Sequence, residues 1–105
     1  MKTLITGTSQ GIGKAIAIYF LEKGHQIIGI DRLPSSITHE LYTHITGDIR
    51  DELPEIDGVE ILINNAGTQN EDDIDINLKA LIHITEKYGV QEKIRSVLNI
   101  GSASA

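Results

Sequence analysis

Three glycines within seven residues, Gly7, Gly11 and Gly13, lie between a short apolar run at residues 2–6 and a stretch with helical spacing. In a strand–turn–helix unit the first allows a tight turn, the second lets the backbone approach a pyrophosphate, and the third lets the helix pack closely on a sheet. The free N–H groups of the helix N-terminus favour an anion there. The stretch predicts a phosphate-binding turn, although an ordinary tight turn would use similar residues. A P-loop is excluded, because Lys14 lacks its glycine spacing and no Ser or Thr follows it.

The rest of the chain alternates short apolar runs with amphipathic stretches. Strands are predicted at residues 2–6, 26–30, 43–46, 60–64 and 96–100. Helices are predicted at residues 12–23, ended by Gly24, and 72–88, followed by Gly89. Buried strands that alternate with amphipathic helices indicate one α/β domain over residues 1–105, with a parallel sheet and helices on both faces.

Two smaller details of this pattern are also predictions. Residues 33–42 are expected to form a loop with at most a short helix, and residues 50–56 to contain at most one helical turn. The apolar positions with helical spacing are Ile12, Ala15, Ile16, Tyr19 and Phe20 in the first helix, and Ile74, Leu78, Leu81, Ile82 and Thr85 in the second.

Asp31 ends the second predicted strand, 18 residues beyond Gly13. A dinucleotide site needs an acidic residue at about this distance, where it accepts hydrogen bonds from the adenosine ribose hydroxyls. A carboxylate there repels the 2′-phosphate of NADP, so the sequence favours NAD. The neighbouring Arg32 is a group that could accommodate that phosphate, but Gln10 leaves the turn without a second basic group. The alternative is that Asp31 is an ordinary solvated loop residue.

Composition excludes several classes of function. Lys and Arg number 9 against 15 Asp and Glu, a net charge of −6, which argues against nucleic acid and an anionic membrane surface. There are no cysteines, and the four histidines are scattered, so neither a thiolate nucleophile nor a metal site is expected. No apolar run approaches a membrane span, and the first residues do not resemble a signal peptide, so a cytoplasmic location is expected.

Five motifs in order along the chain resemble those of the classical short-chain dehydrogenase/reductase family. Residues 6–13, TGTSQGIG, resemble the family's TGxxxGxG turn, and the Asp48-Ile49 pair after Gly47 resembles its adenine-contacting segment. Asn64-Asn65-Ala66-Gly67 matches the family's NNAG. Asn77 and Ser102 occupy positions similar to those of its catalytic Asn and Ser.

The resemblance implies a Rossmann-like sheet of about five strands in the order 3-2-1-4-5, and hydride transfer between nicotinamide and an alcohol or ketone. It implies that Ser102 polarises the substrate and that Asn77 organises a water chain. The residues expected to contact the cofactor are Gly7, Ser9, Gln10, Gly11, Ile12, Gly13, Asp31, Asp48, Ile49, Asn65, Ala66 and Gly67.

The family's acid/base pair, Tyr-x-x-x-Lys, is expected about a dozen residues after Ser102, beyond Ala105. The chain is therefore expected to be the amino-terminal part of the family fold and inactive alone. Tyr19 and Lys23 have the right spacing, but they lie in the first helix and are not expected to be catalytic. A non-catalytic dinucleotide-binding or scaffolding fragment, or a fragment that only folds, remains an alternative. Self-association into a homo-oligomer is expected in each case.

Overall fold

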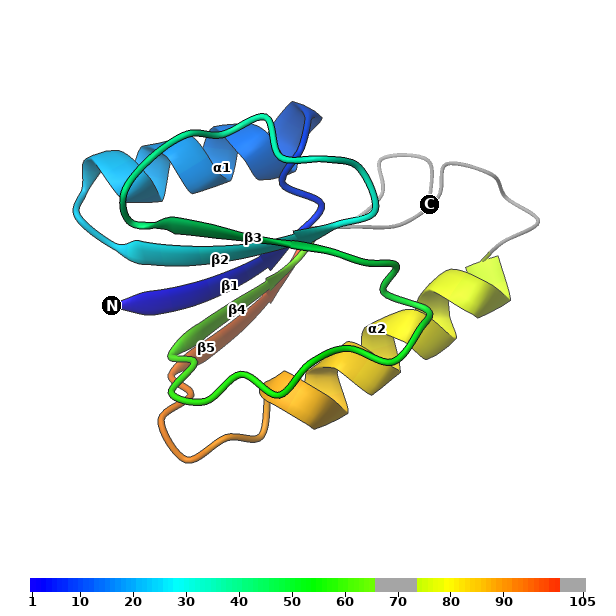
Figure 1. Cartoon of the computed structure of the whole chain (residues 1–105). Helices are drawn as coiled ribbons and strands as arrows, with labels where there is room; N and C mark the ends of the chain where they lie inside the picture. The colour runs from blue at the N-terminus through cyan, green and yellow to red at the C-terminus, as the bar shows by residue number, and fades with distance from the viewer. Residues whose placement is uncertain (66–73, 101–105) are drawn as a thin grey trace.

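The computed structural model describes residues 1–65 and 74–100 of the chain. These residues form one parallel sheet of five strands in the order β3-β2-β1-β4-β5, with two helices (Figure 1). The strands are β1 (Lys2–Thr6), β2 (Gln26–Asp31), β3 (Tyr42–Thr46), β4 (Ile61–Asn64) and β5 (Ser96–Asn99). The helices are α1 (Gly11–Glu22) and α2 (Ile74–Tyr88). The predicted Rossmann-like order is confirmed.

The two helices cover opposite faces of the sheet (Figure 1). Successive residues of β1 show why, because Leu4 faces one side of the sheet and Ile5 the other, and both are fully buried. Leu4 packs in a cluster with Ile84 and Tyr88 of α2. Ile5 packs in a second cluster with members of α1. Neither described helix has the length and apolar character that crossing a bilayer requires.

The face that each helix buries differs from the apolar stripe of the sequence. In α1 the buried residues are Gly13, Ala17 and Leu21, whereas Ile12 is 61% and Tyr19 58% exposed. The fully buried positions are displaced from that stripe by one residue, about 100° around the helix, although Ile16 and Phe20 of the stripe are partly buried against the second cluster. The cause is Gly13, the position at which α1 comes closest to the end of β1.

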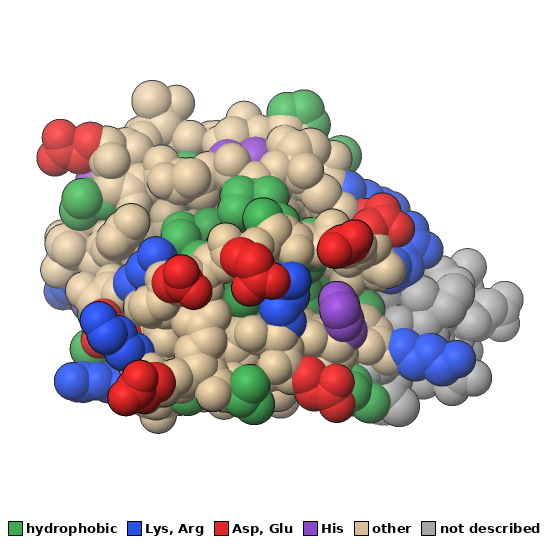
Figure 2. All heavy atoms as spheres, turned by 60° about the horizontal axis from the view of Figure 1, so that its bottom comes forward, with side chains coloured by type: hydrophobic (Ala, Val, Ile, Leu, Met, Phe, Trp, Pro, Cys, Tyr) green, Lys and Arg blue, Asp and Glu red, His purple; other side chains and the backbone are tan. Residues whose placement is uncertain are grey.

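The second helix shows the same kind of difference. Ala80, Ile84 and Tyr88 are buried in α2, whereas Ile82 is 48% exposed. The side chains of Ile74 and Leu78 lie outside the described residues. Figure 2 shows the face that carries α2, where acidic and basic side chains are interspersed and hydrophobic ones lie between them.

The two segments for which the sequence predicts at most a short helix or one helical turn contain no helix. Residues 32–41 form an irregular connection from β2 to β3, and residues 47–60 connect β3 to β4 with a turn near Arg50. Gly24 follows α1 with φ of 85°, so the predicted glycine after this helix is confirmed.

Candidate functional site

The carboxyl ends of the five parallel strands lie at one edge of the sheet, where such folds bind ligands (Figure 1). This edge brings the glycine turn after β1 next to Asp31 at the end of β2 and Asn65 after β4. The segment Gly47 to Ile49 follows β3 at the same edge.

The three turn glycines meet different geometric requirements. Gly7 and Gly11 have φ of 78° and 64°, a backbone region that residues with a Cβ atom rarely adopt. A Cβ atom on Gly13 would overlap with the Gly7 carbonyl oxygen and with Nδ2 of Asn65. Only glycine at position 13 therefore lets α1 begin this close to the end of the sheet.

The N-terminus of α1 is open to a ligand. Gln10 is the residue before the helix, and its side chain forms no capping hydrogen bond. Gln10, Gly11 and Ile12 are exposed, and the first turn of the helix contains no acidic residue. An anion can therefore approach the free N–H groups of this turn.

Neighbouring strands hold the turn by hydrogen bonds. The Gly7 amide donates to the Ile30 carbonyl at 2.7 Å, and Asn65 Nδ2 donates to the Gly7 carbonyl at 3.1 Å. The Asn65 amide donates to Oγ1 of Thr6 at 3.0 Å. Asn65 thus connects the end of β4 to the turn, while the next two residues of its motif, Ala66 and Gly67, lie outside the described residues.

Asp31 has a structural role that the sequence did not reveal. Its Oδ2 accepts the Ser9 amide at 2.9 Å, and its Oδ1 accepts the Leu33 amide at 2.9 Å. Each oxygen of a carboxylate can accept more than one hydrogen bond, so a ribose hydroxyl can still be bound. Asp31 therefore ties the turn to the end of β2 without losing its capacity for a ligand.

The loop after β2 closes over Ser9. Ser9 Oγ donates to the Pro34 carbonyl at 2.9 Å, and Ser36 Oγ donates to the Ser9 carbonyl at 2.6 Å. Ser9 is buried as a result. Its side chain holds the loop, which leaves the exposed backbone of Gln10 and Gly11 as the part of the turn facing solvent.

Sequence reasoning missed a second contact to the turn, from β3. Thr8 Oγ1 lies 2.7 Å from the hydroxyl of Tyr42, which lies 2.8 Å from Nδ1 of His44. Burial raises the pKa of the Tyr42 phenol, which is therefore neutral at ordinary pH. One signal was present in the sequence: Gly29, an isolated glycine inside an apolar strand, often marks a close approach of another group.

The segment after β3 places Asp48 in an ion pair. Arg50 Nε donates to Oδ1 of Asp48 at 2.9 Å, and the Arg50 amide donates to the same oxygen at 2.9 Å. The hydrogen bond from the Arg50 side chain lowers the pKa of Asp48 to about 2. Ile49 is partly buried against the α2 side of the core. The role of Asp48 and Ile49 toward adenine stays a prediction.

The two residues with predicted catalytic roles lie largely outside the described residues. Asn77 lies in the backbone of α2, but its side chain is outside the described residues, as is all of Ser102. At the end of β4, Asn64 Nδ2 donates to Oδ1 of Asn99 at 2.9 Å. A side-chain hydrogen bond thus joins β4, whose last residue begins the NNAG motif, to β5, which precedes Ser102 in the sequence.

The Tyr19–Lys23 pair lies on the exposed side of α1. Tyr19 is 58% exposed, and Nζ of Lys23 is 5.4 Å from the centre of its ring. Across the residues that the structure describes, no group of three His, Cys, Asp or Glu side chains could hold a metal ion.

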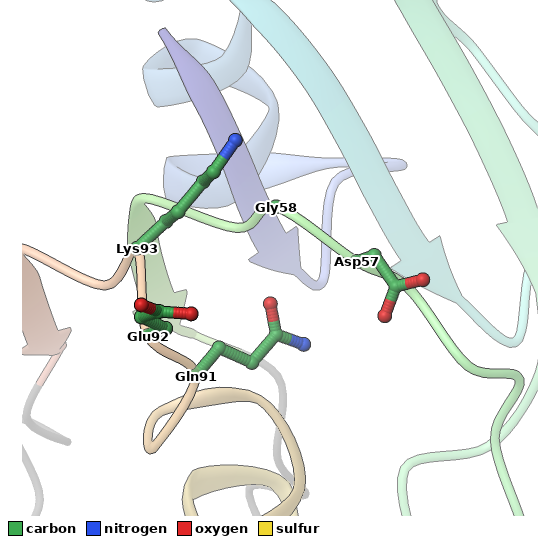
Figure 3. Close-up of a pocket in the computed structure, with 5 residues that line it drawn as sticks. All are labelled: Asp57, Gly58, Gln91, Glu92 and Lys93. Carbon is green, nitrogen blue, oxygen red and sulfur yellow. The ribbon is translucent and has the colours of Figure 1, made fainter.

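The depression in Figure 3 lies at the other edge of the sheet. It has a volume of about 430 Å³ and is lined by Asp57, Gly58, Gln91, Glu92 and Lys93, which precede β4 and β5. Gln91 uses its side chain to accept the Val59 amide at 3.1 Å. The depression is therefore separate from the glycine turn and contributes no group to it.

Comparisons with known proteins agree with this geometry. A model of the NAD dependent epimerase/dehydratase family matches residues 3–105. The NADPH-dependent pterin aldehyde reductase of Arabidopsis thaliana is 35% identical over 89 residues, which cover 65% of this chain and 36% of that protein. The chain thus spans little more than a third of that relative.

Solved structures show the same fold. Serine dehydrogenase from Escherichia coli superposes with a TM-score of 0.82 and 26% identity, over 99% of this chain and 63% of that one. A short-chain dehydrogenase/reductase superfamily protein from Agrobacterium tumefaciens, solved with bound NAD, has a TM-score of 0.78 and 19% identity, over 97% of this chain and 33% of that one. The chain belongs to the NAD dependent epimerase/dehydratase family and matches the amino-terminal, Rossmann-fold portion of a short-chain dehydrogenase/reductase.

Proposed function

We propose that the carboxyl edge of this sheet binds a nicotinamide dinucleotide, with the pyrophosphate at the turn between Gly7 and Gly13. The observation that carries the proposal is the close approach at Gly13, which a Cβ atom would prevent and which brings the start of α1 against the end of β1. The exposed amides at the N-terminus of α1 then bind the anion, with Ser9, Gln10 and Ile12 around it.

The adenosine end of the ligand would lie against Asp31 and the segment Asp48-Ile49. The fixed carboxylate of Asp31 accepts the ribose hydroxyls and repels a 2′-phosphate, which favours NAD over NADP. One relative is named as an NADPH-dependent enzyme. The cofactor preference of this chain therefore depends on Asp31 itself rather than on that likeness.

At the nicotinamide end, the bound cofactor supplies or accepts a hydride, and the whole protein would use it to interconvert an alcohol and a ketone. In this proposal Asn65, Ala66 and Gly67 line the cofactor, Ser102 polarises the substrate oxygen, and Asn77 holds a water in the proton path. The acid/base Tyr and Lys would come from elsewhere than α1, because Tyr19 is exposed and Lys23 covers its ring.

Binding is tested by calorimetric titration of the chain with NAD and separately with NADP. We expect NAD to bind more tightly, and Asp31→Ser to reduce this preference about tenfold, because the repelling charge is lost. Asp57→Ser, at the opposite edge, is the matched control and should leave the preference unchanged. A chain that binds neither dinucleotide would falsify the proposed function, and equal loss in both variants would exclude Asp31 from the site.

A second candidate is a dinucleotide-binding module without turnover. It would need only the glycine turn and Asp31, which a hydrogen bond brings together. The absorbance of reduced nicotinamide during incubation with simple ketones separates the two candidates. Oxidation above the uncatalysed rate requires a complete site, whereas binding without oxidation supports the module.

A further inference from the structure

A line of hydrogen-bonded side chains joins the glycine turn to β3, an outer strand of the sheet. Thr8 lies in the turn, Tyr42 and His44 lie on β3, and the line ends at the Leu33 carbonyl in the loop after β2. The three distances are 2.7 Å, 2.8 Å and 3.0 Å. The hydroxyl of Thr8 is fully buried, so a partner within the protein is required.

Chemistry fixes the direction of these hydrogen bonds in neutral His44. The Leu33 carbonyl can only accept, so Nε2 of His44 carries the proton and Nδ1 is an acceptor. Tyr42 therefore donates to His44, and Thr8 donates to Tyr42. The buried Thr8 hydroxyl thus donates to Tyr42, whose own proton is accepted by His44.

The line crosses a strand. In the sheet order, β2 lies between β1 and β3, so Tyr42 must reach over β2 to meet Thr8 in the turn after β1. Gly29 of β2 is paired with His44 and lies directly beneath this contact. A Cβ atom on Gly29 would overlap with the Tyr42 hydroxyl and with Oγ1 of Thr8, and would lie 2.9 Å from a ring carbon of Tyr42. The contact exists only because position 29 has no side chain.

Three consecutive turn residues are consequently held by three different parts of the sheet. Gly7 is bonded to Asn65 after β4, Thr8 to Tyr42 on β3, and Ser9 to Asp31 at the end of β2. Hydrogen bonds that are made before a ligand arrives reduce the entropy lost on binding. Removal of one of them should then weaken binding as well as folding.

We propose that Tyr42 is a positioning residue for the phosphate-binding turn, holding Thr8 across β2 with His44 behind it. This inference rests on the proposed dinucleotide site, and it adds to that site a residue that touches no part of the ligand. The alternative is that the Tyr42 hydroxyl contributes to stability alone, as any buried hydrogen bond does.

The experiment uses two matched tyrosine variants. Tyr42→Phe removes the hydroxyl that holds Thr8. Tyr88→Phe removes a hydroxyl that is bonded to the Pro54 carbonyl on the other face of the sheet; Tyr88 is fully buried, whereas Tyr42 is partly buried. The dissociation constant for NAD and the urea unfolding midpoint are measured for both and for wild type. We expect Tyr42→Phe to weaken NAD binding about fivefold at a temperature where it is folded, and Tyr88→Phe to leave it unchanged.

Substitutions at Thr8 sharpen the result. Thr8→Ser keeps the hydroxyl and should bind NAD as wild type does, whereas Thr8→Val should weaken binding about as much as Tyr42→Phe. The double variant Thr8→Val/Tyr42→Phe should be no weaker than either single variant, because the same hydrogen bond is lost.

Two outcomes overturn the inference, and they are distinguishable. If wild type binds NAD and the two tyrosine variants bind equally well, Tyr42 has a structural role only, and the dinucleotide site stands. If wild type binds neither NAD nor NADP, the proposed function fails and this inference with it.

Hydrogen exchange of the Gly7–Gly11 amides in the ligand-free chain is the second measurement. Tyr42→Phe should accelerate it more than Tyr88→Phe does, and equal rates would also count against the positioning role.

Discussion

The two outer strands of the sheet, β3 and β5, are held in place very differently. Both lie at an edge in the order of strands. In β3, Tyr42, His44 and Ile45 are partly buried, and two of them reach the glycine turn or the loop beside it. All four residues of β5 are exposed, and one of them, Asn99, accepts a side-chain hydrogen bond from Asn64 of the neighbouring strand β4.

This difference indicates which edge depends on the binding turn. Side chains fasten β3 to the turn that we propose holds phosphate, so folding of this edge and the shape of the turn are coupled. Among the described residues, β5 pairs with β4 alone, and its Val97 and Leu98 are 39% and 50% exposed. An edge strand with exposed apolar side chains is a surface for further pairing. Of the two outer strands, β3 thus supports the turn directly, while Asn65 after β4 supports it from the other side.

The largest effect is expected from truncation of a leucine in β4, the strand next to β5. Leu62→Ala in β4 should lower the free energy of unfolding by about 3 kcal/mol, because this side chain is fully buried and a cavity is left. Leu98→Ala in β5 should lower it by less than about 1 kcal/mol, because half of its surface is already in contact with water. Urea unfolding measures both. Similar losses would mean that β5 is covered in solution, by self-association or otherwise, and dilution would then reveal it.

On the β3 side, Gly29→Ala should lower the free energy of unfolding by about 2 kcal/mol. Its methyl group enters the space between Thr8 and the Tyr42 hydroxyl, so both side chains must move. Gly47→Ala is the matched control, because a Cβ atom there meets only Cδ2 of Leu53 at 3.5 Å, an ordinary contact. The measurement is again urea unfolding. If Gly29→Ala were as stable as Gly47→Ala, the contact across β2 would not be maintained in solution.

The parallel sheet followed from features that are local in sequence, whereas its strand order followed from the resemblance to the short-chain dehydrogenase/reductase family. Apolar runs of strand length, the periodic stretches between them, and the glycines at 7, 11 and 13 each specify their own segment. The site residues at 31 and 65 were placed at the correct edge for the same reason, because they directly follow predicted strands. Their roles toward a ligand stay predictions, as do those of Asn77 and Ser102.

What the sequence did not show depends on contacts between distant segments. The buried face of α1 is set by the approach of Gly13 to Gly7, which outweighs the larger apolar side chains of Ile12 and Tyr19. The bond from Thr8 to Tyr42 joins residues 34 apart and crosses another strand. Periodicity carries no information on such a crossing, and only the isolated Gly29 marked it.

The smallest effect is expected at the end of β3, where Arg50 pairs with Asp48. Arg50→Gln should lower the free energy of unfolding by about 0.5 kcal/mol at pH 7, because Arg50 is 41% exposed and water screens the pair. The pKa of Asp48 is about 2 in the folded chain against an ordinary 3.8. A carboxyl group whose pKa is lowered by folding stabilises the folded state at pH values above its unfolded-state pKa. This contribution is lost as the pH falls through the folded-state pKa of about 2.

The part of the difference in unfolding free energy between wild type and Arg50→Gln that depends on the Asp48 carboxylate should therefore be constant above about pH 5 and be lost below about pH 2. Urea titrations at several pH values measure it, and since both proteins share all other carboxyl groups, these cancel in the difference. A difference that persists well below pH 2 would show that Arg50 stabilises the chain through a contact other than Asp48. One that exceeds the effect of Gly29→Ala would show that the exposed ion pair, and not the contact across β2, is what fastens the β3 edge.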